Sequence, residues 1–134
     1  MPLAGTLDLN SGVMELTGMV FRCMEPPRHI YIPLFDANLD SDEMLLVNCI
    51  TLRESSIDDT CILMPLDYHE LTHETTVAYS RAMVEKKSAF MRAMETGHFI
   101  QLDNLPLATW CKIVEGGHNS EELPRAKKRL LPSL

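Results

Sequence analysis

The sequence predicts an α+β domain, in which a β-rich segment is followed by two or three short helices. Before residue 82, apolar residues form short runs that alternate with polar ones or continue unbroken, as in strands. After it, apolar residues recur at intervals of three and four, as on one face of a helix. We therefore expect a single domain over residues 1–134, with a β-barrel part (18–82) and a helical part (83–134).

Four segments of the β part have the composition of strands, and we expect a small, strongly bent antiparallel sheet or barrel. The first strand should end before Pro26 and Pro27, because proline lacks the backbone donor that a sheet requires. The run that starts at Met44 is apolar on both faces, as in a central strand. The four segments are 18–23, 29–35, 44–51 and 60–64, and the β-branched stretch 75–79 also favours extended backbone.

The helical part contains two clear amphipathic segments and a weaker third one. Residues 84–96 and 106–115 are predicted to be helices packed on the sheet, and the glycines 116–117 are predicted to end the second. Ser120 is a candidate cap for the third helix, whose acidic residues come first and basic ones last. Trp110 lies at the centre of the apolar stripe of the second helix, so we expect it to be largely buried.

Composition and charge restrict the compartment and the partners. Hydrophobic residues make up 46% of the chain and charged residues 23%, which is typical of a globular protein. No apolar run reaches the roughly 18 residues of a membrane span, and the four cysteines form no C-x-x-C pair, so we expect a cytoplasmic protein with no membrane partner. The net charge of −7 means that a nucleic acid would have to bind at a local basic patch.

One short motif suggests a metal site. His69-Glu70-Leu71-Thr72-His73 matches H-E-x-x-H, which on a helix places two imidazoles on one face for zinc and a glutamate as general base. However, Pro65 lies just upstream, and the residues that follow the motif favour a strand. We therefore expect no metal and no cofactor, with a zinc metallohydrolase using His69, Glu70 and His73 as the alternative.

A series of segments forms a pattern of order and spacing over most of the chain: Arg28-His29-Ile30-Tyr31-Ile32, 46–54, 59–63, Asp67, 73–82, 97–100, 105–107, 113–116, Ser120, Pro124 and Lys127-Lys128. In this order and at this spacing they resemble a family of short bacterial domains of the PemK/MazF-like toxin type. Two residues depart from the family pattern, namely Tyr68 in place of a histidine and Glu70 in place of an apolar residue.

The resemblance implies an SH3-like antiparallel β-barrel followed by helices, and an endoribonuclease that needs no metal. In such an enzyme a base takes the proton of the 2′-hydroxyl group, and cationic donors stabilise the phosphate during the reaction. The candidate catalytic residues are Arg28, Thr51, Arg53 and His73. They lie at the ends of different strands, so the hypothesis requires them to meet in one cleft.

Three functions stay open at this point. The first is an RNase toxin that acts on RNA and is paired with a small antitoxin. The second is a catalytically silent domain of the same fold that binds or regulates another protein. The third is the zinc hydrolase. Oligomeric state, with a homodimer as one option, and bacterial or phage origin are left open by the sequence.

Overall fold

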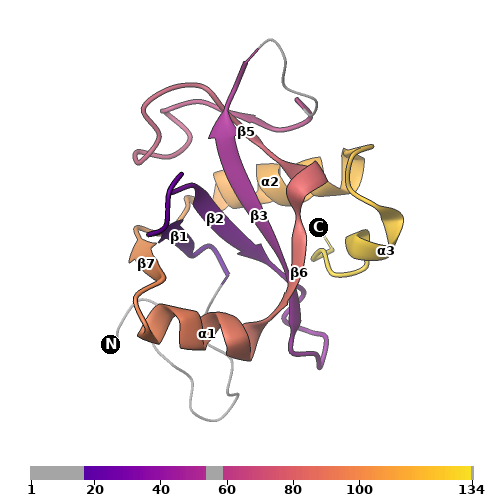
Figure 1. The fold of residues 1–134 in the computed structure, drawn as a ribbon. Helices are drawn as coiled ribbons and strands as arrows, with labels where there is room; N and C mark the ends of the chain where they lie inside the picture. Colours follow the sequence, from indigo (N-terminus) through magenta and orange to yellow (C-terminus); the bar gives the residue numbers. More distant parts are fainter. Residues whose placement is uncertain (1–16, 54–58, 134) are drawn as a thin grey trace.

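The computed structural model describes residues 17–53 and 59–133. Within these residues seven strands form one antiparallel sheet, accompanied by three α-helices, and the predicted α+β class is confirmed (Figure 1). The described part contains no helix that is long and apolar enough to cross a membrane. The strands are β1 (Val20–Cys23), β2 (Ile30–Leu34), β3 (Glu43–Thr51), β4 (Ile62–Leu63), β5 (Thr75–Val77), β6 (Met83–Lys86) and β7 (Phe99–Leu102). The helices are α1 (Lys87–Glu95), α2 (Leu107–Asn119), α3 (Arg125–Lys128) and the 3-10 turn η1 (Tyr79–Arg81).

Strand β3 is the centre of the sheet. It pairs along one side with β2, while on its other side its first half pairs with β6 and its second half with β5. Its residues 44–49 are all buried, because helices and loops cover both faces of the sheet at this strand. The prediction of a central strand from residue 44 to residue 51 is therefore confirmed.

Two hydrophobic cores lie on opposite faces of the sheet, and neighbouring residues of one strand belong to different cores. Val20 packs into the larger core with Ile113 of α2, whereas Phe21 packs into the smaller core with Phe90 of α1. Figure 1 shows β1 and β2 running between α1 and α2. The alternation of strand side chains between the two faces thus accounts for the run of apolar residues that the sequence contains at each strand.

The sheet is open. Among the described strands β4 pairs only with β5, and β7 pairs only with β1, so the two ends of the sheet do not meet. The closed barrel that the sequence resemblance implied is not formed by these strands. Closure depends on strand tilt and register around the whole sheet, which local sequence patterns do not determine.

The division into a β part and a helical part is less clean than expected. Residues 83–86 were predicted near the start of a helix, but they form β6, and α1 begins only at Lys87. The backbone of this segment pairs with residues 43–46 of β3. Pairing with an available strand outweighs the weak helical pattern of a four-residue segment. Strand β7 also lies beyond the predicted boundary between the two parts.

Helix α2 is longer than predicted and turns a different face to the core. It runs through Gly116 and Gly117 to Asn119, and both glycines are buried. A β-carbon at Gly116 would lie only 2.5 Å from the hydroxyl oxygen of Tyr79, so the helix approaches Tyr79 more closely than any side chain would allow. Trp110 packs beside the larger core but is only partly buried. The prediction that Trp110 is largely buried at the centre of the apolar stripe is therefore wrong. Ser120 ends α2 rather than starting a helix.

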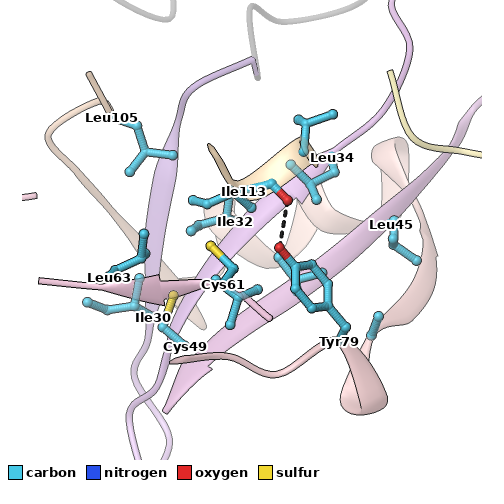
Figure 2. Packing of buried hydrophobic residues seen from close by; sticks show 14 of the residues in the cluster. Ile30, Ile32, Leu34, Leu45, Cys49, Cys61, Leu63, Tyr79, Leu105 and Ile113 are labelled. Atoms are coloured by element: carbon cyan, nitrogen blue, oxygen red, sulfur yellow. Dashed lines mark hydrogen bonds between the residues drawn. The ribbon is translucent and has the colours of Figure 1, made fainter. Parts of the chain in front are cut away.

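Figure 2 shows the contact between this helix and the sheet. The hydroxyl group of Tyr79 donates a hydrogen bond of 2.6 Å to the backbone carbonyl of Ile113, and both residues are fully buried. Cys61 and Cys49 lie in the same core. The tyrosine therefore ties η1 to α2 in the interior of the larger core.

The cysteines should differ in reactivity. Cys49 and Cys61 are buried, and burial, together with the neighbouring Cys61, raises the pKa of the Cys49 thiol to about 12. Because the thiolate is the nucleophile, neither buried cysteine should react with iodoacetamide in the folded protein. We expect mass spectrometry to find modification at Cys23 and Cys111 only, and at all four cysteines after unfolding in urea. Rapid modification of Cys49 in the native protein would contradict the described core.

Candidate functional site

A cleft of about 380 Å³ opens at the end of the sheet where β1, β2, β3 and β5 come together. Its walls come from the turn between β1 and β2, the end of β3 and the loop between β4 and β5. The charged and polar lining residues are Arg22, Arg28, His29, Thr51, Glu70, Thr72, His73 and Thr75, and the others are Pro27, Ile30, Cys49, Ile50 and Leu71.

The register of the strands brings these residues together. Arg22 of β1 lies opposite Ile30 of β2, and Ile30 lies opposite Cys49 of β3. At the end of β3, Thr51 pairs with Thr75 of β5. Ile30 and Cys49 belong to the larger core, so the cleft is the polar end of that core.

His73 is held by threonine hydroxyl groups on both ring nitrogens. Its Nε2 atom lies 2.8 Å from Oγ1 of Thr51, and its Nδ1 atom lies 2.9 Å from Oγ1 of Thr72. The hydroxyl of Thr75 donates to the His73 backbone carbonyl at 3.0 Å. A hydroxyl group can donate or accept, so this arrangement accommodates the neutral or the protonated imidazole. The ring is exposed and oriented, and a bound molecule would exchange a proton with it by displacing one of the two threonine hydroxyl groups.

Arg28 occupies an unusual backbone conformation. Its φ angle is +61°, in the left-handed region that residues other than glycine seldom adopt. The backbone NH of Arg28 donates to the carbonyl of Glu25, and the guanidinium of Arg22 donates from Nη1 to the carbonyl of Arg28 at 3.3 Å. A non-glycine residue in this region costs about 1–2 kcal/mol, and such strain often occurs at functional sites.

The cleft is locally basic although the chain is acidic overall. The guanidinium groups of Arg22 and Arg28 contribute two positive charges against the one negative charge of Glu70. Burial, and then the charge of Arg81, lower the pKa of His29. Because an unperturbed histidine is already mostly neutral at pH 7, His29 is a neutral imidazole there and can accept a proton.

Three of the four predicted site residues line this cleft, namely Arg28, Thr51 and His73. Arg53 is exposed just beyond the end of β3 and is not among the lining residues. Arg22 and Thr72 also line the cleft and were not predicted from the sequence. Arg22 is a single charge inside a strand, and only the cross-strand register shows that it lies at the cleft.

The H-E-x-x-H motif does not have the geometry of a zinc helix. Residues 64–74 form turns and irregular backbone, so the i, i+4 face that would present two imidazoles is absent. Nε2 of His69 lies 2.8 Å from Oδ2 of Asp103, whereas His73 contacts Thr51 and Thr72. The two histidines therefore belong to different clusters.

This arrangement suits an anionic ligand that has an exchangeable proton. Two guanidinium groups can bind a phosphate, and the imidazole of His73 can take part in proton transfer. The hydroxyl groups of Thr51 and Thr72 keep the ring of His73 oriented. Comparisons with family models, curated proteins and solved structures gave no match for this chain, so its function has to be inferred from the cleft itself.

Proposed function

We propose that the chain is a metal-independent endoribonuclease that binds RNA in this cleft. His73 takes the proton of a ribose 2′-hydroxyl group while the 2′-oxygen attacks the adjacent phosphorus. The bond from phosphorus to the 5′-oxygen breaks, and this oxygen takes up a proton from solvent water as it leaves, so a 2′,3′-cyclic phosphate is formed. Arg28 and Arg22 stabilise the charge on the phosphate oxygens during this step.

The observation that supports this proposal is the presence of two arginines and an oriented histidine in one cleft of an acidic protein. The arginines come from β1 and the turn after it, and the histidine comes from the loop before β5. An acidic protein repels RNA over most of its surface, so a basic cleft also selects where the RNA binds.

The finer identity of the domain is part of the same proposal. The assignment to the PemK/MazF-like toxins, with a small antitoxin partner, is supported by the sequence resemblance from residue 28 to residue 128, whereas the open sheet departs from the closed SH3-like barrel that the resemblance implied. An antitoxin that inhibits by covering the cleft would have to place acidic side chains against Arg22 and Arg28. The proposed compartment is the cytoplasm, where RNA is accessible.

Replacement of Arg28 by glycine tests the proposal. Glycine adopts a φ of +61° without strain, so Arg28→Gly should change the free energy of unfolding by no more than about 1 kcal/mol. Loss of the guanidinium should lower RNA cleavage about 100-fold or more, the usual effect of removing a donor to a transition-state anion. Cleavage is measured on single-stranded RNA in the presence of EDTA, and stability by urea denaturation.

Arg92→Ala is the matched control, because Arg92 is an exposed arginine on α1, outside the cleft. It should retain cleavage. Equal loss of cleavage in both variants would contradict a specific role of Arg28.

A catalytically silent binding module is the second candidate. It is favoured by the position of Arg53 outside the cleft and by the net charge of −7. In this case the wild-type protein would not cleave RNA with or without EDTA. That result would reject the nuclease and leave a domain whose cleft binds an acidic segment of a protein.

A further inference from the structure

We propose that His69, Glu70 and Asp103 bind a divalent transition-metal ion of the Zn²⁺ type. One ligand atom from each of these three residues lies within 4.8 Å of the other two. The closest pair is Nε2 of His69 and Oδ2 of Asp103, at 2.8 Å. The inference goes beyond the proposed nuclease, which uses no metal.

The distances fit a shared ion after small side-chain rotations. Zinc binds nitrogen and oxygen ligands at about 2.0–2.2 Å. Two ligands on one such ion are therefore separated by roughly 3 to 3.5 Å. His69 and Asp103 are already near this separation, and the Glu70 oxygen lies within 4.8 Å of both ligand atoms, so it would have to come closer when an ion binds.

The donor atoms decide the class of ion. Imidazole nitrogen favours zinc and its transition-metal neighbours over Mg²⁺ and Ca²⁺, which prefer oxygen ligands. Three protein ligands leave one or more positions for water, and the site is open to solvent because the His69 and Asp103 side chains are 62% and 75% exposed. An ion can therefore enter from water without any opening of the fold.

The two segments that supply the ligands are tied together beside the cluster. Tyr68, which is buried, donates from its hydroxyl group to the backbone carbonyl of Asp103. The backbone NH of Leu71 donates to the carbonyl of Tyr68 and closes the turn that carries His69 and Glu70. The loop before β5 and the segment after β7 thus hold the three ligands near one another before an ion binds.

The proposed ligand set is not that of the H-E-x-x-H motif. Asp103 takes the place of His73, whose ring nitrogens contact Thr51 and Thr72. Asp103 lies far from the motif in the sequence, and only the fold brings it close. Glu70 also lines the cleft, so a bound ion would lie at the edge of the RNA site.

Calorimetric titration of the full chain with Zn²⁺ alone tests the proposal. We expect one ion per chain, and His69→Ala and Asp103→Asn should each weaken binding by about tenfold or more, since even indirect support of a ligand contributes this much. Both positions are exposed, so the variants should fold, as circular dichroism would verify. His73→Ala and Glu74→Gln, which remove a neighbouring imidazole and a neighbouring carboxylate of the same loop, should bind as the wild type does.

Absence of saturable Zn²⁺ binding would reject the site, and His69 and Asp103 would then form only a surface contact. Loss of binding in His73→Ala with retention in Asp103→Asn would instead assign the ion to the sequence motif and also reject the site. Co²⁺ serves as a spectroscopic probe, because a thiolate-to-metal band would place the ion on a cysteine and contradict the proposal. None of these measurements uses RNA, so they are independent of the proposed nuclease.

Discussion

Replacement of His73 by alanine should lower RNA cleavage by about 10²- to 10⁴-fold, the usual contribution of a general acid or base. The side chain is exposed, and its contacts are with the hydroxyl groups of Thr51 and Thr72. Exposed hydrogen bonds of this kind add little to folding, so the free energy of unfolding should fall by no more than about 1 kcal/mol. The rate of cleavage and the urea midpoint of the same samples are the two measurements.

His98→Ala is the matched control. His98 is also exposed, and its Nδ1 atom lies 2.7 Å from a threonine hydroxyl, that of Thr96, but it lies outside the cleft. It should leave cleavage unchanged. If His73→Ala cleaves RNA at the wild-type rate, His73 is not the proton-transfer group, and His29 would be the remaining imidazole of the cleft.

Gly116→Ala should destabilise the fold by about 1–3 kcal/mol, the usual cost of overpacking a core. The new β-carbon would lie 2.5 Å from the hydroxyl oxygen of Tyr79 and 2.8 Å from Cβ of Cys61. Tyr79 is fixed by its bond to the carbonyl of Ile113, and the Cβ of Cys61 can move only with its backbone. The gain in helix propensity from glycine to alanine, up to about 1 kcal/mol, opposes this cost but does not cancel it.

Urea denaturation of a double-mutant cycle identifies the contact. In a Tyr79→Phe background the shortest overlap is removed, so Gly116→Ala should cost less than it does in the wild type. Glu115→Ala, at an exposed position of the same helix, should have little effect. Additive effects of Gly116→Ala and Tyr79→Phe would show that the tyrosine hydroxyl is not the source of the cost.

The sequence predicted those strands in which the pattern of apolar residues matches the faces that are buried in the fold. The run from Met44 is apolar on both faces because two cores cover it, and the prolines 26–27 end the strand before them. It did not predict β6 or the continuation of α2 through Gly116, because both depend on a partner distant in sequence. For Gly116 this partner is Tyr79, and a glycine that permits close packing has the same local pattern as one that ends a helix.

The candidate site was also predicted only in part, because some of its residues come together only through contacts between segments that are distant in sequence. Arg28 and His73 follow from chemistry and from the resemblance, and both line the cleft. Arg22 and Asp103 were missed because each lies at its cluster only through the register of the sheet or the path of a later loop. The local sequence around a basic residue in a strand or an acidic residue in a loop does not indicate that the residue belongs to a binding site.

The pairing of β1 with β7 has a consequence for how the protein forms during synthesis. Residues 20–23 cannot gain their second neighbour until residues 99–102 have been made and have left the ribosome. Contacts between such distant segments form slowly, because a long loop has to close first. Arg22 lies on β1, so we expect the basic end of the cleft to be completed late, after most of the chain has been translated. A growing chain would therefore contain most residues of the cleft before they are assembled into a binding site.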